Sequence, residues 1–168
     1  MAERNSDGRE FVITRLIDAP REMVWRAFTE AEHLTHWWGP KGFTMMSCKL
    51  DLRVGGTFHY GMKSPEGYEM WGKWTFREIV APERLTILIS FSDKDGGITR
   101  HPMAPDWPAQ MQGTSIFTEQ GDKTLLTNRT IAFDATDVER KTFEGGFAGM
   151  EQGFSGTFDQ LADYLKKM

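Results

Sequence analysis

Apolar and polar residues alternate along residues 11–17 (FVITRLI), and this period of two predicts a β-strand. Pro20 ends the strand and suits the first turn of a helix, and apolar residues then recur at helical spacing over residues 21–28. Thr29 followed by Glu32 forms a capping-box pattern, which predicts the start of a second short helix that runs to about residue 38. We therefore expect one strand and two consecutive short helices at this end of the chain.

Six further segments have strand-like patterns, and turn-forming residues separate them. The turn at residues 64–67 (SPEG) has a clear mechanism, because Pro presets φ and Gly accepts positive φ. Successive strands joined by such turns favour an antiparallel meander. The six segments are residues 43–52, 57–62, 68–80, 85–91, 111–119 and 123–133.

Residues 137–168 predict a last helix, because large apolar side chains step by three or four positions throughout. A strip of glycines flanks this stripe, although each glycine costs a helix about 0.5–1 kcal/mol relative to alanine. Such a smooth flank lets either another backbone or a ligand come close, and a bend near Gly145 and Gly146 is a further possibility. The stripe consists of Phe143, Phe147, Met150, Phe154, Phe158, Leu161 and Leu165, and the strip of Gly146, Gly149, Gly153 and Gly156.

Residues 93–110 form a long loop that contains three prolines, two glycines and the apolar Met103 and Trp107. A loop of this length in a compact domain is often functional. It either covers a sheet edge or acts as a gate over a pocket, and the pattern leaves both interpretations open.

Large, adaptable apolar side chains are abundant, with 12 Phe, 6 Trp and 10 Met among 168 residues. They predict either a well-filled core or a cavity lined by soft side chains, since methionine suits irregular surfaces. The adjacent Trp37 and Trp38 cannot both be buried on one side of a helix end, so we expect one to fill the core and the other to rim an opening.

Charge and cysteine content exclude several classes of protein. The formal net charge is −4 and no basic stripe is present, so we do not expect nucleic-acid binding. The single cysteine, Cys48, excludes an internal disulfide and fits a reducing compartment. No apolar run reaches the ~18 residues that span a bilayer, and the polar N-terminus lacks the apolar core of a signal peptide. We expect a cytoplasmic protein with a short disordered leader, residues 1–9, and a single domain, residues 10–168.

The cysteine and most of the histidines give little indication of a metal site or a catalytic site. His33 and His36 are three residues apart without a third ligand, so no metal is predicted, and no motif indicates a cofactor. Strand parity directs His59 away from the face that carries Phe58, and Cys48 lies in the middle of an apolar strand, where it acts as a small core residue.

Two residues remain as candidates for acid–base chemistry. Glu78 shares strand parity with Trp74 and Phe76, so it is either an inward carboxylate with a raised pKa or the partner of an arginine near the sheet end. His101 lies in the long loop and could face a pocket.

Several segments together resemble one superfamily, the helix-grip fold that includes START domains and polyketide cyclases. Within it, the chain is most similar to the bacterial family related to the C-terminal domain of the activator of the heat-shock-protein-90 ATPase. The resemblance extends over about residues 10–167 and contains no catalytic signature. Its motifs are residues 19–29 (APREMVWRAFT), 32–34 (EHL), 37–40 (WWGP), 51–56 (DLRVGG), 82–85 (PERL) and 153–161 (GFSGTFDQL).

The resemblance implies an α+β domain with the order β-α-α-β6-α, in which a curved antiparallel sheet wraps around a long C-terminal helix. It also implies a cavity between sheet and helix. By strand parity, the cavity walls would be Trp38, Met46, Phe58, Tyr60, Met70, Trp74, Phe76, Phe91, Phe117, Phe147, Met150 and Phe154, with Glu78 as the one inward carboxylate.

Three functions follow as alternatives. The leading one is binding of a small hydrophobic or aromatic molecule in this cavity without defined catalysis. The second is a cyclase- or hydrolase-type enzyme that uses Glu78 or His101 in the same cavity. The third is interaction with a heat-shock chaperone through the protein surface, and a homodimer is compatible with all three.

Overall fold

The computed structural model describes residues 9–168, so all but the last residue of the expected leader, residues 1–9, lies outside the described residues. Both the strand at the beginning and the two short helices after it are present. They are β1 (Phe11–Ile17), α1 (Arg21–Thr29) and α2 (Ala31–Trp37). The other strands are β2 (Thr44–Leu50), β3 (Thr57–Lys63), β4 (Glu69–Val80), β5 (Arg84–Ser92), β6 (Ile98–Thr99), β7 (Gln110–Gln120) and β8 (Lys123–Phe133). The last helices are α3 (Asp137–Gly145) and α4 (Phe147–Leu165).

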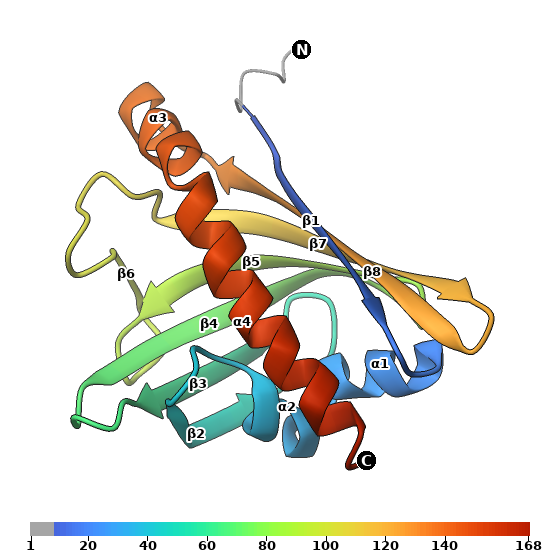
Figure 1. Cartoon of the computed structure of the whole chain (residues 1–168). Coiled ribbons are helices and arrows are strands. Elements are labelled where there is room, and N and C mark those ends of the chain that lie inside the picture. Colours follow the sequence, from blue (N-terminus) through green and yellow to red (C-terminus); the bar gives the residue numbers. More distant parts are fainter. Residues whose placement is uncertain (1–8) are drawn as a thin grey trace.

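All strands form one antiparallel sheet in the order β1-β8-β7-β5-β4-β3-β2, and the short β6 pairs with β5. Helix α4 runs across one face of this sheet, and α1 and α2 lie near its C-terminal end (Figure 1). This is the predicted α+β arrangement of a sheet that grips a helix. The structure adds β6, which the pattern of the long loop did not reveal.

The boundary between α1 and α2 differs from the expected capping box. Thr29 is the last residue of α1, and its hydroxyl donates to the carbonyl oxygen of Trp25 at 2.8 Å. Glu30 caps α2 instead, without a side-chain hydrogen bond to the helix. The capping-box prediction at Thr29 was therefore wrong, because its hydroxyl already has a partner inside the preceding helix. A complete capping box is present at the start of α3, between Thr136 and Glu139.

The expected last helix is divided at Gly146, which caps both α3 and α4. Trp107 of the long loop lies against this position, and a Cβ atom on Gly146 would stand 2.8 Å from its Cζ3 atom. A Cβ atom on Gly149 or Gly153 would meet no atom within 4 Å apart from the backbone of its own helix. Of the two interpretations of the glycine strip, close backbone packing therefore does not apply at these two positions.

Two β-bulges change which side chains face α4. One lies between Met45 and Ser47 in β2, and the other lies between Phe76 and Glu78 in β4. Each bulge inserts one extra residue, so strict alternation fails on its far side. Met46 and Glu78 are the two expected cavity residues that the bulges displace.

The apolar core consists of two clusters under α4. The larger one joins α1, α2, the sheet and the C-terminal part of α4, and includes Phe28, Trp37, Phe58 and Phe158. The smaller one surrounds Phe11, Ala132 and Phe143 at the other end of the helix. Phe154 packs against both clusters.

Candidate ligand-binding cavity

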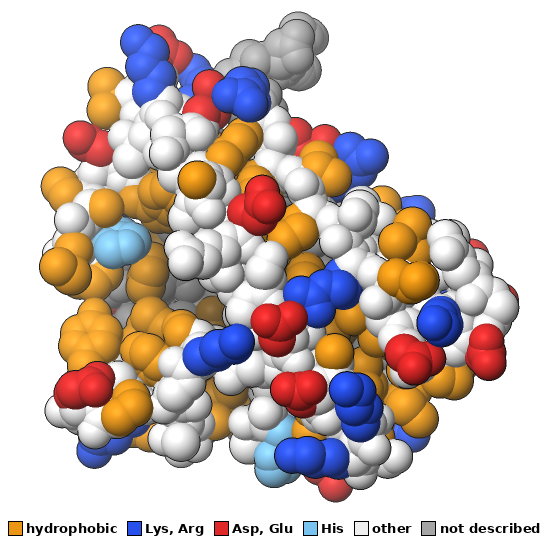
Figure 2. Space-filling view, viewed as in Figure 1, with side chains coloured by type: hydrophobic (Ala, Val, Ile, Leu, Met, Phe, Trp, Pro, Cys, Tyr) orange, Lys and Arg blue, Asp and Glu red, His pale blue; other side chains and the backbone are white. Residues whose placement is uncertain are grey.

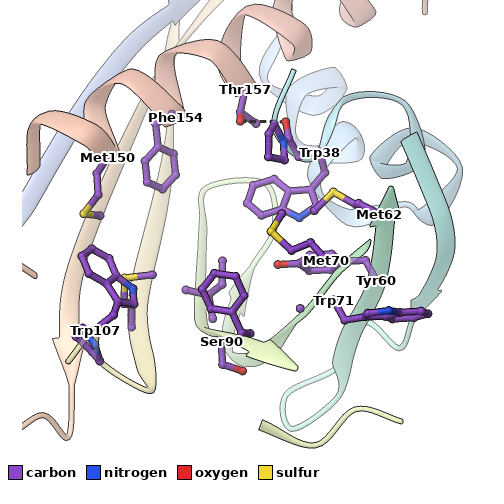
Figure 3. Close-up of a pocket in the computed structure, with 18 of the residues that line it drawn as sticks. Trp38, Tyr60, Met62, Met70, Trp71, Ser90, Trp107, Met150, Phe154 and Thr157 are labelled. Atoms are coloured by element: carbon purple, nitrogen blue, oxygen red, sulfur yellow. Dashed lines mark hydrogen bonds between the residues drawn. The ribbon is translucent and has the colours of Figure 1, made fainter. Parts of the chain in front are cut away.

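A cavity of about 280 Å³ lies between the two core clusters, under the middle of α4. Figure 2 shows this face of the molecule, which is hollowed beside α4 and bordered by apolar side chains. Figure 3 shows how the lining side chains of the sheet, the long loop and the helix point toward a common space. The lining residues are Trp38, Gly39, Pro40, Tyr60, Met62, Met70, Trp71, Gly72, Ile89, Ser90, Phe91, Trp107, Pro108, Ala109, Met111, Met150, Gly153, Phe154 and Thr157.

None of these residues is charged. Thr157 uses its hydroxyl to donate to the carbonyl oxygen of Gly39 at 3.2 Å, which ties α4 to the segment after α2. Gln160 reinforces this link, since its side-chain amide donates to the same carbonyl oxygen at 2.7 Å. The helix wall of the cavity is thus held in place by hydrogen bonds that leave the cavity itself apolar.

The two adjacent tryptophans lie in different surroundings, one in the core and one at the cavity, as predicted. Trp37 is 1% exposed, and its indole N–H donates to the carbonyl oxygen of Ala27 at 2.9 Å. Trp38 lies at the C-terminal end of α2 and lines the cavity. Its ring meets that of Trp74 edge-on, with centroids 4.9 Å apart.

Tyr60 is the polar side chain at the same end of the cavity. It is 5% exposed, and its ring centroid lies 5.9 Å from that of Trp38. Burial raises the pKa of its hydroxyl far above the ordinary value, and the nearby indole N–H groups of Trp38 and Trp74 offset only part of this rise. Tyr60 therefore stays protonated and keeps a hydrogen to donate.

Six of the expected wall residues lie on the cavity lining, and they come from α2, the sheet and α4. These residues are Trp38, Tyr60, Met70, Phe91, Met150 and Phe154. The agreement follows from alternation in β3, the first part of β4 and β5, where no bulge intervenes before the residue concerned.

Four other expected wall residues are buried in the larger core cluster instead of facing the main cavity. Their exposed fractions are 0–2%, because neighbouring aromatic rings cover them. Phe117, for example, packs edge-on against Trp25 and Phe28, with centroids 5.4 and 5.1 Å away. The four residues are Phe58, Trp74, Phe76 and Phe117.

Met46 and Phe147 also lie outside the cavity lining. Met46 is 41% exposed at the bulge in β2, while Met45 takes the inward position opposite Met62. Phe147 packs against Phe11 in the smaller core cluster, with ring centroids 5.5 Å apart. The bulge and the division at Gly146 account for these two corrections.

Glu78 does not enter the cavity. Arg84 donates to it through Nε at 2.9 Å and through Nη2 at 3.2 Å, so the second of the two interpretations of this residue is correct. This ion pair with Arg84 lowers the pKa of the Glu78 carboxyl, which is the opposite of the shift that an inward catalytic acid requires. The bulge after Phe76 turns Glu78 away and brings Ile79 against the core.

His101 is held outside the cavity lining as well. Its Nδ1 atom accepts a hydrogen bond from the backbone N–H of Met103 at 3.0 Å, and its ring packs against Phe91 with centroids 5.0 Å apart. Glu78 and His101 are therefore not brought together as an acid–base pair.

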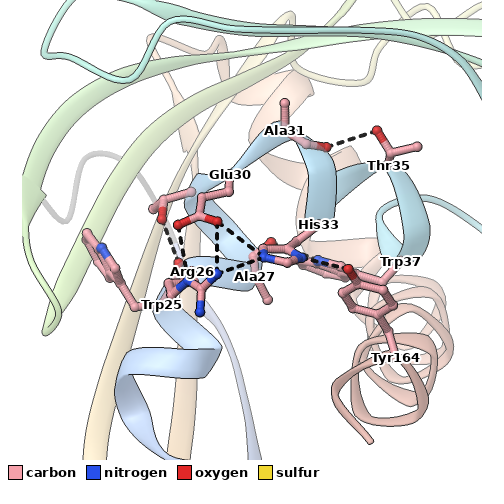
Figure 4. A network of polar contacts seen from close by, with 10 residues as sticks. Trp25, Arg26, Ala27, Glu30, Ala31, His33, Thr35, Trp37 and Tyr164 are labelled. Carbon is pink, nitrogen blue, oxygen red and sulfur yellow. Dashed lines mark hydrogen bonds and ion pairs between the residues drawn. The ribbon is translucent and has the colours of Figure 1, made fainter. Parts of the chain in front are cut away.

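The remaining histidines and the cysteine have structural surroundings. Figure 4 shows His33 between the first helices and α4. Its Nδ1 atom lies 2.6 Å from the Tyr164 hydroxyl oxygen, and its Nε2 atom lies 3.2 Å from Glu30 Oε1. His36 stacks on Tyr164, with centroids 5.2 Å apart.

His59 contacts Ser92 and the backbone after it, away from the cavity, as strand parity predicted. Cys48 is half-buried and packs against the core.

A second void of about 50 Å³ adjoins the cavity and shares Trp38, Ile89, Met111 and Phe154 with it. Trp74 and a buried polar group on the sheet line the void. In this group the Asn128 amide donates to Ser115 Oγ at 3.2 Å, and the Thr130 hydroxyl donates to Asn128 Oδ1 at 2.6 Å. Each of these side chains therefore has a partner.

Several cavity residues were not predicted from the sequence. Met62 shares the inward parity of Tyr60 in β3 and could have been found from it. Trp107 and Met111 belong to the long loop and to the first residues of β7, where no periodic pattern gives the direction of a side chain. Gly153 and Thr157 lie one turn apart on α4, beside the apolar stripe.

Residues 9–168 contain neither a metal-binding cluster of side chains nor a membrane-spanning helix. No group of three or more His, Cys, Asp or Glu side chains within this range could hold a metal ion. No helix within it is long and apolar enough to cross a membrane.

A curved antiparallel sheet around a C-terminal helix, with an apolar cavity between them, defines the helix-grip class of START-like proteins. The family model described as "Activator of Hsp90 ATPase homolog 1-like protein" matches residues 18–166, and the chain belongs to this family. Among curated proteins, none matches the chain significantly.

Solved structures of the same fold come from several bacteria. A protein from Nitrosomonas europaea is 27% identical, with a TM-score of 0.73 over 94% of each chain. A protein from Arthrobacter aurescens is 24% identical, with a TM-score of 0.76 over 99% of this chain and 91% of its own. The AHSA1-like protein from Aeromonas hydrophila is 20% identical, with a TM-score of 0.67 over 95% of this chain and 93% of its own. The last two similarities concern the fold alone.

Proposed function

We propose that this protein binds a small, uncharged, largely apolar molecule in the cavity under α4. The observation that carries the proposal is a space of about 280 Å³ that the abundant Phe, Trp and Met side chains leave unfilled. The side chains that line this space leave apolar surface in contact with solvent, and a ligand that covers this surface gains free energy through the hydrophobic effect.

The lining supports an uncharged occupant. It contains no charged side chain, so a charged ligand would lose its hydration without gaining an ionic partner. A ligand that buries about 200 Å² of apolar surface would gain about 5 kcal/mol at 25 cal/mol per Å². After the costs of association, such a gain corresponds to weak or moderate affinity.

Ligand-dependent thermal stabilisation tests this proposal. We expect neutral bicyclic aromatic compounds to raise the melting temperature, because a ligand that binds only the native state stabilises it by mass action. Met150→Trp should abolish the increase by filling the cavity, while Val138→Thr, at an exposed position on α3, should leave it unchanged. An absence of stabilisation across neutral aromatic, terpenoid and fatty-alcohol compounds would contradict the proposal.

Membership of the family also suggests contact with a heat-shock chaperone, and a homodimer remains compatible with the fold. The large exposed apolar side chains favour neither a chaperone complex nor a homodimer, because they come from separate elements. They include Val12 and Leu16 on β1, Met46 on β2, Met103 in the long loop and Val138 on α3. Analytical ultracentrifugation of the protein, alone and with a chaperone middle domain, would detect such complexes.

A further inference from the structure

Three hydrogen-bond donors lie close together where the cavity adjoins the larger core cluster, since Tyr60 and Trp38 line the cavity and Trp74 lines the void beside it. They are the Tyr60 hydroxyl and the indole N–H groups of Trp38 and Trp74. The Trp38 ring stands edge-on to both partners, with centroids 5.9 Å from Tyr60 and 4.9 Å from Trp74. We call these three side chains the donor cluster.

Two of these donors are buried and lack a well-formed hydrogen bond. Neither Trp38 Nε1 nor Trp74 Nε1 makes a hydrogen bond of ordinary geometry to any residue in the described part of the chain. A buried indole N–H usually finds an acceptor, as that of Trp37 does at the carbonyl oxygen of Ala27, 2.9 Å away. An indole can only donate, and the oxygen that both N–H groups approach is the Tyr60 hydroxyl, whose pKa their approach lowers.

Tyr60 completes the cluster from the neighbouring strand. Its hydroxyl lies over Gly72 of β4, where a Cβ atom would stand 2.6 Å from the hydroxyl oxygen. Figure 3 shows this hydroxyl directed into the cavity, beside the indole of Trp38. Glycine at position 72 therefore leaves the space in which the hydroxyl can reach a ligand.

We propose that the donor cluster recognises one uncharged acceptor oxygen, a ketone or ester carbonyl, on an otherwise apolar ligand: the Tyr60 hydroxyl donates to this oxygen, and the two indole N–H groups lie behind the hydroxyl. This inference rests on the proposed function and specifies its ligand class. A carbonyl oxygen accepts hydrogen bonds and donates none, so it suits a hydroxyl that donates into the cavity. A carboxylate would find the same donors but no cation, since none of the lining residues is charged.

Three probes with one bicyclic skeleton test the inference: α-tetralone, which carries a ketone, tetralin, which carries no oxygen, and the carboxylate of tetralin. Their affinities for the full chain are measured by titration followed in proton–nitrogen NMR spectra. The six tryptophans give six indole N–H signals, which Trp→Phe variants assign. We expect α-tetralone to move the Trp38 or Trp74 indole signal downfield, tetralin to leave both near their free positions, and the carboxylate to bind at least tenfold more weakly than the ketone.

Tyr60→Phe keeps the ring and removes the hydroxyl. We expect the ratio of the tetralone and tetralin affinities to fall about three- to tenfold, the effect of one hydrogen bond in a buried site. Met150→Leu, on the helix wall, is the control and should change both affinities together.

The outcomes separate the two proposals. Equal ratios in wild type and Tyr60→Phe, with no movement of either indole signal, would overturn the donor cluster as a recognition site while leaving apolar binding intact. Carboxylate binding as tight as ketone binding would overturn the requirement for an uncharged oxygen. If neither neutral probe binds, the proposed function fails and this inference fails with it. The indole signals of the wild type decide the matter even if Tyr60→Phe does not fold.

Discussion

The indole of Trp107 lies against Gly146, the residue at which α3 and α4 divide. A Cβ atom on Gly146 would stand 2.8 Å from Cζ3 of Trp107. Trp107 also packs against Phe143, with ring centroids 5.7 Å apart, and lines the cavity. The break between the last two helices therefore positions one wall of the cavity.

Gly146→Ala should displace Trp107 and lower the free energy of unfolding by about 1–3 kcal/mol, the usual cost of overpacking. Gly145→Ala is the matched control, because a Cβ atom there meets nothing within 4 Å. It should stabilise α3 by about 0.5–1 kcal/mol through helix propensity. Urea denaturation measures both. Similar shifts in the two variants would show that contact with Trp107 is not the reason for glycine at position 146.

Gly153→Ala should stabilise the protein but weaken ligand binding. Gly149 and Gly153 both have open space around a Cβ atom, so alanine should add about 0.5–1 kcal/mol of helix stability at either position. Only Gly153 lines the cavity, and its methyl group would take volume from a ligand. Melting temperatures and tetralone titrations of both variants check this. A loss of affinity in Gly149→Ala equal to that in Gly153→Ala would count against the placement of the ligand.

Trp37→Phe and Trp38→Phe should differ sharply in stability although the residues are adjacent. The first leaves a gap at a 1% exposed position and removes the hydrogen bond to Ala27, so we expect a loss of about 2–4 kcal/mol. The second removes an indole N–H that has no partner among the described residues, and we expect less than 1 kcal/mol. Denaturant titration of the two proteins provides the comparison, and equal losses would contradict it.

Asp159→Asn should change how stability depends on pH. Arg15 on β1 donates to the Asp159 carboxylate at 2.8 Å and lowers the pKa of this carboxyl below its ordinary value, with a smaller effect of Lys41. A lowered pKa in the folded state adds stability above the ordinary pKa of about 4, and this contribution disappears as the pH falls through the folded-state pKa. The difference in melting temperature between wild type and variant should be constant from pH 7 to about pH 5 and should close below about pH 4. A difference that persists at low pH would exclude the ionic origin.

Much of the fold could be predicted from local patterns. Alternation gave the strands, and the spacing of Phe and Leu gave the C-terminal helix with errors of a few residues. The Trp37 and Trp38 pair was correctly divided between core and cavity rim, because two adjacent residues at a helix end must point in different directions. Thr29 was misassigned because a capping-box pattern does not show whether the hydroxyl already has a partner in the preceding helix.

On the sheet, the walls of the candidate cavity could be predicted only where strand alternation was unbroken. Tyr60 and Met70 lie before any bulge in their strands and were placed correctly, whereas Met46 and Glu78 lie at bulges and were not. A bulge inserts one residue and leaves no mark in composition. Phe58 and Phe117 have the expected inward direction, but neighbouring aromatic rings fill the space in front of them.

The sequence alone determined the class of fold, because secondary-structure periodicity and the family motifs are properties of short segments. The tertiary structure decided where the cavity lies, because a cavity is the volume left over when all elements have packed. It also brought the indoles of Trp38 and Trp74 beside the Tyr60 hydroxyl. The number of apolar residues cannot distinguish a filled core from an open one, since that difference depends on a few ångströms of separation between α4 and the sheet.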